Sequence, residues 1–202
     1  WEISPKVHDR DAYNQLTSLT KELISLYDLQ GRLDEDPFSP TRLRKLSLPD
    51  KKVSDLLDES TCLITGGLGC VGTALINEVL KFDVKRIIIL DKKRPDKKFS
   101  DPRFTYVECD VRDSENVHQT FRQYRPDFVF HTAAQRDPGY AESHISETIS
   151  TNVFGTLNIV KACEESGVKQ CVFSSTGKSS RYFTEEIYAG TKKLCEYILE
   201  AY

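Results

Sequence analysis

Short apolar segments alternate with longer amphipathic segments from Thr61 onward, and this alternation constrains the fold more than any other feature. We expect strands at residues 61–65, 86–91, 103–108, 127–133 and 168–174, and helices at 70–81, 114–124, 144–166 and 184–202. Strands that are apolar nearly throughout are typical of a parallel sheet covered by helices on both faces. The sequence therefore predicts a doubly wound α/β domain over residues 61–202, whose ligand lies beyond the carboxyl ends of the strands.

Residues 1–60 differ in character from this domain. Apolar residues recur at near-helical spacing through residues 10–31, which predicts one amphipathic helix, and residues 50–58 predict a second, shorter one. No set of residues with catalytic character stands out here. We expect a helical N-terminal extension that serves in packing or oligomerisation, with docking of a partner protein as the alternative.

Composition excludes several classes of protein. The 202 residues are 39% hydrophobic and 29% charged, as in globular proteins, and the net charge of -3 argues against nucleic-acid binding. No apolar run approaches the roughly 20 residues that span a bilayer, and no signal-peptide pattern opens the chain. The six cysteines have neither C-x-x-C nor zinc-ligand spacing, so we expect no metal site and a cytoplasmic protein with reduced thiols.

Glycines gather where the first expected strand meets the first expected helix. Gly67-x-Gly69-x-x-Gly72 matches the dinucleotide fingerprint, in which missing side chains let the backbone turn tightly and approach a pyrophosphate at a helix N-terminus. Asp91 ends the second expected strand, where its carboxylate is placed to accept hydrogen bonds from the adenosine ribose. The sequence therefore predicts a dinucleotide site.

Asp91 favours NAD over NADP, because a carboxylate repels a 2′-phosphate. Lys92, Lys93 and Arg94 follow directly and can pair with such a phosphate, so NADP stays open.

The full sequence of this region is a more specific signal than the dinucleotide fingerprint alone. Residues 65–72 read T-G-x-x-G-x-x-G, and "CDVRD" (109–113), "HTAA" (131–134) and "TNVFGTLN" (151–158) follow at the expected strand and helix ends. In these stretches the chain resembles the extended short-chain dehydrogenase/reductase family, in the polysaccharide-biosynthesis branch of nucleotide-sugar epimerases and dehydratases, which has a Rossmann-like fold. The cofactor residues that this resemblance implies are Thr65, Gly66, Gly67, Gly69, Cys70, Val71, Gly72, Asp91, Asp110, Val111, Thr132, Ala133, Ala134, Asn152, Tyr188 and Lys192.

The stretch "YAGTK" bears on whether the domain also performs chemistry. Tyr188 and Lys192 are four residues apart and share one face of an expected helix. An ammonium beside a phenol lowers the phenol pKa from about 10, which suits proton transfer near neutral pH. The resemblance implies that Tyr188 is the acid/base, that Lys192 assists it and contacts the nicotinamide ribose, and that Thr176 or Ser175 orients the reacting oxygen.

The chain departs from the branch at one position. The fifth strand of that group typically ends Ser-Thr-Asp-Lys, where the Asp helps to expel a sugar hydroxyl as water. Gly177 stands at this place, and the following Lys178 faces either the substrate or its diphosphate. Glu185 or Glu186 is a candidate replacement acid, although glutamates near a helix start also serve as helix-dipole partners. Epimerisation needs no separate acid, so epimerase and dehydratase both stay open.

The resemblance thus implies an NAD(P)-dependent enzyme that acts on a nucleotide sugar, with a UDP-sugar as the first expectation, and a homodimer formed through the fourth and fifth helices of the fold. The alternatives are a dehydrogenase or ketoreductase with an exchanging cofactor, and a non-catalytic dinucleotide-binding sensor or scaffold. The family continues into a C-terminal substrate domain, and we expect that domain to lie beyond Tyr202.

Overall fold

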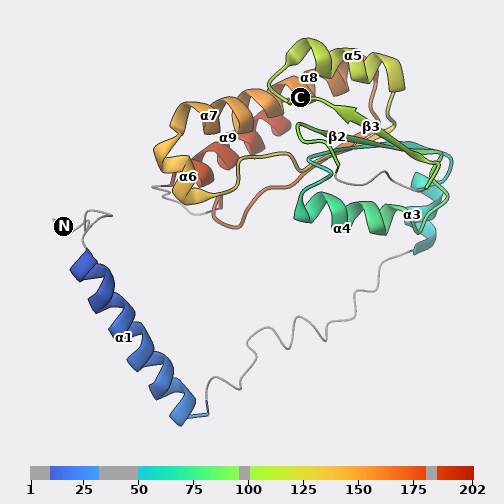
Figure 1. Ribbon diagram of the computed structural model, residues 1–202. Coiled ribbons are helices and arrows are strands. Elements are labelled where there is room, and N and C mark those ends of the chain that lie inside the picture. Colours follow the sequence, from blue (N-terminus) through green and yellow to red (C-terminus); the bar gives the residue numbers. More distant parts are fainter. Residues whose placement is uncertain (1–9, 32–49, 96–100, 181–185) are drawn as a thin grey trace. The chain divides into compact units, whose positions relative to one another are not determined.

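The structure is a computed structural model that describes residues 10–31, 50–95, 101–180 and 186–202. Contacts divide the chain into two units, Trp1–Leu48 and Pro49–Tyr202. The first unit contains α1 (Arg10–Leu29; Figure 1), close to the helix expected at residues 10–31. The leucine side chains of α1 are largely exposed.

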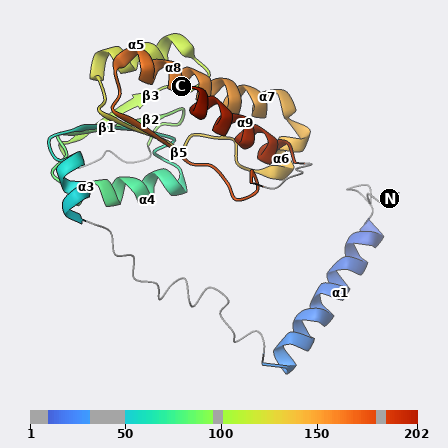
Figure 2. The same cartoon turned by 180° about the vertical axis from the view of Figure 1, so that it is seen from behind.

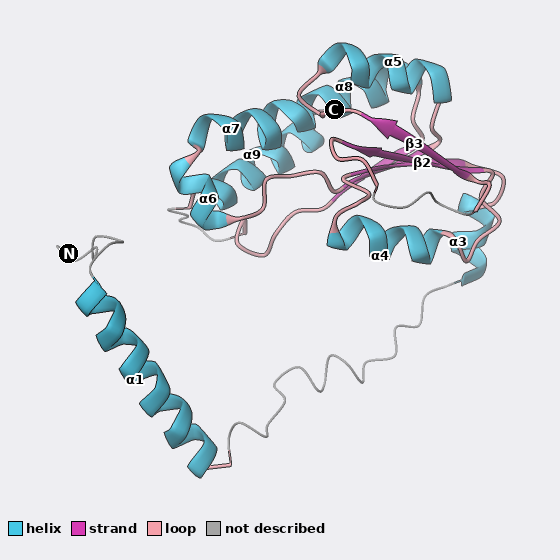
Figure 3. Ribbon diagram, in the orientation of Figure 1, coloured by secondary structure: helices cyan, strands magenta, loops and turns pink. Residues whose placement is uncertain are grey.

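The second unit is built on a β-sheet, whose strands are magenta in Figure 3. The sheet has five strands, all parallel, in the order β3-β2-β1-β4-β5. The strands are β1 (Thr61–Thr65), β2 (Arg86–Asp91), β3 (Phe104–Glu108), β4 (Phe128–His131) and β5 (Gln170–Phe173). The order reverses between β1 and β4, which is the switch point of a doubly wound sheet. The predicted fold class is confirmed.

Helices cover both faces of this sheet, as the views from front and behind agree (Figures 1 and 2). The helical elements of the second unit are α3 (Asp50–Leu57), α4 (Cys70–Val79), α5 (Ser114–Tyr124), α6 (Pro138–Ser143), α7 (Ile145–Ile149), the π-helical turn η1 (Ser150–Phe154), α8 (Gly155–Ser166) and α9 (Ile187–Ala201). In the described residues, no helix is both long enough and apolar enough to span a membrane.

Alternate residues of each strand pack into two apolar cores, one on each face of the sheet. Cys62 and Ile64 of β1 pack with α3 and α4, whereas Leu63 points to the opposite face and packs with α5 and α8. Successive residues of a strand point to opposite faces, so a strand covered on both sides is apolar throughout. This explains why the strand segments were visible in the sequence.

Three details differ from the expectations. The helix expected at 144–166 is divided into α7, η1 and α8. α6 was not expected; Pro138 opens it, and the Asp137 carboxylate caps it by accepting the Tyr140 N–H at 2.9 Å. α3 packs through Leu57 on the second unit, so the boundary by contacts precedes α3 rather than following it.

Candidate functional site

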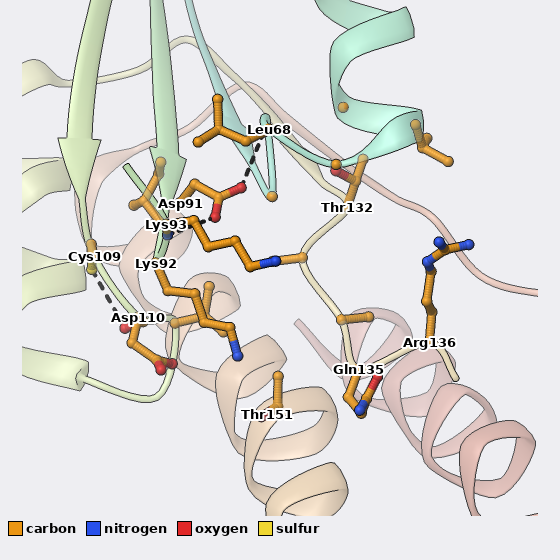
Figure 4. Close-up of a pocket in the computed structure, with 18 of the residues that line it drawn as sticks. Leu68, Asp91, Lys92, Lys93, Cys109, Asp110, Thr132, Gln135, Arg136 and Thr151 are labelled. Atoms are coloured by element: carbon orange, nitrogen blue, oxygen red, sulfur yellow. Dashed lines mark hydrogen bonds between the residues drawn. The ribbon is translucent and has the colours of Figure 1, made fainter. Parts of the chain in front are cut away.

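A cleft of about 550 Å³ lies at the carboxyl ends of the strands (Figure 4). It is lined by the residues that follow β1, β2, β3 and β4, and by two side chains from α7 and η1. The predicted cofactor residues that line it are Gly66, Gly69, Cys70, Val71, Gly72, Asp91, Asp110, Val111, Thr132, Ala133 and Ala134. The predicted residues that lie outside its lining are Thr65, Gly67, Asn152, Tyr188 and Lys192.

The glycine turn closes so tightly that side chains do not fit. Gly66 has a φ of +65°, and a Cβ there would lie 2.8 Å from the backbone of Ala133. A Cβ on Gly72 would lie 2.4 Å from the Gly66 carbonyl oxygen. The turn therefore brings bare backbone to the start of α4, whose first N–H groups have no partner within the helix and suit an anion such as a pyrophosphate.

Backbone contacts fix the Asp91 carboxylate at the edge of the cleft. It accepts the N–H groups of Leu68 and Lys93, each at 3.0 Å (Figure 4). Lys92 and Lys93 also line the cleft, whereas Arg94 forms an ion pair of 2.6 Å with Glu108. Only part of the basic cluster noted in the sequence therefore faces a ligand.

Asp110 lies across the cleft from the glycine turn, at the end of β3 (Figure 4). The Arg112 guanidinium binds its carboxylate at 2.7 Å and holds the pKa of that carboxyl below its usual range. The Val111 carbonyl accepts the Asn158 side-chain amide at 2.9 Å, which ties this loop to α8.

Thr151 is a candidate ligand contact that the sequence reasoning missed. It belongs to η1, lines the cleft and is only 7% exposed. Its Oγ1 is the one buried side-chain oxygen or nitrogen without a hydrogen-bond partner among the described residues. A buried, unpaired hydroxyl costs about 1–3 kcal/mol, so this atom is suited to a ligand group that pairs with it. The signal in the sequence is its position directly before Asn152. Other lining residues that were not predicted are Leu68, Leu90, Cys109, Gln135, Arg136 and Glu147.

Thr65 and Asn152 do not line the cleft, but their side chains hydrogen-bond the segments that do. The Thr65 hydroxyl accepts the N–H groups of Thr132 and Ala133 and bonds the His131 Nδ1 at 2.6 Å. The Asn152 side chain accepts the Gln135 N–H at 2.7 Å and donates to the Thr191 hydroxyl at 2.9 Å. They join the ends of β1 and β4 to η1 and α9, which fixes the floor of the cleft.

His131 is fully buried and neutral in this network. Its Nε2 lies 3.0 Å from the Thr156 hydroxyl, which itself donates to the Asn152 carbonyl. Nε2 therefore carries the proton, and Nδ1 accepts from Thr65. Burial, and secondarily the charge of Lys192, lower the pKa of His131 to about 3.

A second group of predicted residues lies on α9 and the segment after β5. Lys192 is 3% exposed; its Nζ donates to the Ser174 carbonyl at 2.9 Å and lies 4.4 Å from the centre of the Phe173 ring. Burial lowers the pKa of Lys192 from 10.5 to about 8. Tyr188 precedes Lys192 by one helical turn of α9, and Lys192 is the member of the pair that contacts the end of β5.

The hydroxyls and cations after β5 have distinct partners. Ser175 bonds the Glu196 carboxylate on α9. The Thr176 hydroxyl accepts the Lys178 N–H at 3.4 Å, and the Lys178 Nζ forms an ion pair of 2.6 Å with Glu186.

Of the two glutamates considered as replacement acids, the structure describes Glu186, whose side chain does not cap α9. Glu186 stands just before α9 and makes no such bond; instead, the Glu142 carboxylate accepts the Ile187 N–H at 2.8 Å. Glu185 lies outside the described residues.

A doubly wound sheet with a bare glycine turn at its switch point defines a Rossmann-type nucleotide-binding domain. A family model described as polysaccharide biosynthesis protein matches residues 62–202, and the chain belongs to this family. The resemblance inferred from the motifs is thereby confirmed.

Curated relatives include a UDP-N-acetylglucosamine 4,6-dehydratase (inverting) of Campylobacter jejuni, 33% identical over 143 residues, which are 68% of this chain and 42% of that protein. A UDP-glucose 4-epimerase of Rickettsia akari is 32% identical over 130 residues, or 60% of this chain and 38% of that protein. The chain thus spans less than half the length of these relatives.

Solved structures give the same picture. The Bordetella bronchiseptica enzyme WbmG in complex with NAD matches with a TM-score of 0.63 and 26% identity over 71% of this chain and 50% of that one. A Thermus thermophilus UDP-glucose 4-epimerase complex with NAD matches with a TM-score of 0.62 and 29% identity over 70% of this chain and 50% of that one.

Proposed function

We propose that this protein is an NAD(P)-dependent enzyme of polysaccharide or glycoconjugate biosynthesis that epimerises or dehydrates a nucleotide sugar. The observation that carries the proposal is the joining of two sites in one fold. The glycine-lined cleft suits a dinucleotide, and the buried Lys192 ammonium lies one helical turn from Tyr188. Similarity to a UDP-N-acetylglucosamine dehydratase and a UDP-glucose epimerase supports a UDP-sugar as substrate.

The residues of the cleft fit the cofactor. Backbone at Gly66 and Gly72 would approach the pyrophosphate, Asp91 would accept from the adenosine ribose, and the unpaired Thr151 hydroxyl would bond a cofactor polar group. The carboxylate of Asp91 favours NAD, while Lys92 and Lys93 in the lining keep NADP open. When bound, the cofactor supplies a hydride acceptor that can return the hydride.

The protein's own groups handle the proton and the orientation. Tyr188 takes the proton of a sugar hydroxyl at its Oη and later gives it back. Lys192 is fixed by the Ser174 carbonyl, so its ammonium stands at a constant place beside the reacting centre. Thr176 or Ser175 orients the sugar oxygen by hydrogen bonding. These roles carry over the resemblance to the positions of this chain.

The segment after β5 favours epimerisation over dehydration. Gly177 has no acidic group, and nothing lies within 4 Å of a Cβ built there. The Lys178 ammonium is held in an ion pair with Glu186. Epimerisation by oxidation and re-reduction at one carbon needs no separate acid. Both observations are therefore compatible with an epimerase.

The proposal extends to assembly and location. Large apolar side chains are exposed on η1 at Phe154 and on α9 at Leu194 and Tyr197, which supports a homodimer through these helices. The six cysteines are free thiols, four of them buried, which supports a cytoplasmic protein. For residues 1–60 we propose a packing or oligomerisation arm, since the leucines of α1 are exposed.

Turnover of UDP-N-acetylglucosamine by the purified protein with NAD, followed by chromatography of the products, tests this function. Tyr188→Phe is expected to lower kcat at least about 100-fold, the range of a lost acid/base. Tyr202→Phe, an exposed tyrosine directly after the same helix, is the matched control and should leave kcat unchanged. Full turnover by Tyr188→Phe would refute the assignment.

A further inference from the structure

Two side chains of α9 fasten the segment that follows β5. Lys192 donates to the Ser174 carbonyl at 2.9 Å. Glu196, one turn further along α9, accepts hydrogen bonds from the hydroxyls of Ser175 and, at 2.6 Å, Ser179. Tyr188, Lys192 and Glu196 are spaced by four residues and follow one face of the helix. The same helical face that carries the proposed acid/base therefore holds the segment.

The contacts of Glu196 enclose Thr176. Ser175 precedes Thr176, and Ser179, only 2% exposed, follows it. The Ser179 hydroxyl lies 2.6 Å from both the Glu196 carboxylate and the Thr176 carbonyl, and its one proton is shared between these two acceptors. The two serine hydroxyls also lie 3.2 Å apart. Hydrogen bonds from both hydroxyls hold the pKa of the Glu196 carboxyl below its usual range. Hydrogen bonds to a charged carboxylate are about twice as strong as neutral ones, so this contact is suited to fix a loop.

The other hydrogen bonds of the described residues 174–180 are few. The Ser174 N–H donates to the His131 carbonyl at 3.1 Å. The hydrogen bond from the Ser180 hydroxyl to the Gly177 carbonyl and that from the Ser179 N–H to the Thr176 carbonyl are internal to the turn. Gly177, in the middle of the turn, gives the backbone additional freedom. Among the described residues, three side-chain contacts connect residues 174–180 to α9 or to Glu186 just before it: that of Lys192, that of Glu196 and the Lys178–Glu186 ion pair.

We propose that Glu196 is a positioning residue for the reaction: it holds Ser175 and Ser179 so that Thr176, between them, presents its hydroxyl to the substrate oxygen. This inference rests on the proposed function and deepens it, because it separates the two hydroxyls that the sequence left as alternatives. Ser175 fastens the segment to α9, and Thr176 contacts the substrate. Glu196 itself touches no reacting atom.

Hydrogen–deuterium exchange of the protein tests the structural half of the proposal without any turnover. Glu196→Ala is expected to speed amide exchange in residues 174–180 about tenfold, while Glu196→Gln, whose amide oxygen still accepts, stays near the wild type. Glu200→Ala is the matched control, because Glu200 is exposed one turn further along α9. Unchanged exchange in Glu196→Ala would overturn the proposal.

Steady-state kinetics test the functional half. Glu196→Ala is expected to lower kcat about 100-fold, the effect of a misplacement near 1 Å, with KM changed by less than about threefold. Glu196→Gln should restore kcat to within about fivefold of the wild type, and Ser175→Ala should lose less than Thr176→Ala. A Glu196→Ala protein with wild-type kcat contradicts the inference.

Tyr188→Phe in the same series of variants distinguishes a failure of the positioning role from a failure of the proposed function. If Tyr188→Phe is inactive and Glu196→Ala is not, the positioning role alone fails. If Tyr188→Phe is fully active, the proposed function fails, and the exchange result still decides whether Glu196 fastens the segment.

Discussion

Replacing Lys192 by Met is predicted to change how the stability of the domain depends on pH. Lys192 is 3% exposed, and burial lowers its pKa from 10.5 to about 8. At about 1.4 kcal/mol per pKa unit, the difference corresponds to about 3 kcal/mol of destabilisation while the folded protein holds the ammonium charged. A buried charge that destabilises the fold is expected where activity requires it.

The lowered pKa of Lys192 determines whether the free energy of unfolding rises or falls with pH. Below pH 8 both the folded and the unfolded chain hold the proton, and the full penalty applies. Between pH 8 and 10.5 the unfolded chain binds a proton that the folded protein has released, so the free energy of unfolding rises with pH. The wild type should therefore gain about 3 kcal/mol relative to Lys192→Met between pH 7 and 10.5.

Urea unfolding followed by far-ultraviolet circular dichroism, at steps between pH 7 and 10.5, measures this difference. Taking the difference between wild type and variant removes the titration of the tyrosines and cysteines that both share. Lys161→Met, an exposed position on α8, is the control and should show a flat difference. If the difference for Lys192→Met also changes by less than about 1 kcal/mol, the burial argument for Lys192 is wrong.

Three further substitutions test the cleft. Gly72→Ala should abolish measurable NAD binding in calorimetry, because its Cβ would lie 2.4 Å from the Gly66 carbonyl oxygen. Gly190→Ala is the control: a Cβ there has nothing within 4 Å, so the substitution should stabilise α9 by about 0.5–1 kcal/mol. Equal NAD binding by the two variants would contradict the tight turn. Asp91→Ser should shift the ratio of NAD to NADP dissociation constants about tenfold toward NADP by removing a repelling carboxylate, and an unchanged ratio would exclude Asp91 from the ribose site. Thr151→Val should weaken NAD binding about fivefold without lowering the melting temperature of the free protein, because the Thr151 hydroxyl has no hydrogen-bond partner among the described residues. A lower melting temperature with unchanged NAD affinity would argue for a structural role of Thr151.

The sheet was predictable because burial on both faces leaves a direct trace in the sequence. β1 and β2 were expected at the residues where they are found, since each is a short, nearly unbroken apolar run. α6 escaped prediction because it is six residues long and depends on Asp137 and Pro138 rather than on helical periodicity. Apolar periodicity also continues through η1, so the π-helical turn that carries Thr151 leaves no trace in the pattern.

Of the candidate site, the residues at strand ends were the predictable part, because parallel strands bring their carboxyl ends to one edge of the sheet. The placement of Thr65 and Asn152 behind the cleft depends on side-chain hydrogen bonds with partners far away in the sequence. The same holds for Ser175, whose partner Glu196 lies 21 residues further along the chain. Spacing alone cannot distinguish Ser175 from Thr176; what distinguishes them in the structure is the hydrogen bond from Ser175 to Glu196.

The central claim is that the cleft above β1 and β4 holds NAD or NADP for the groups on α9. Mass spectrometry of the nucleotide released on denaturing the purified protein, with calorimetry of any protein that is empty as purified, tests it most directly. The account predicts NAD, retained or bound on addition, at about one per chain, which is the stoichiometry of a single switch-point cleft. A folded protein that binds neither NAD nor NADP would show that the glycine turn is only structural and would contradict the account.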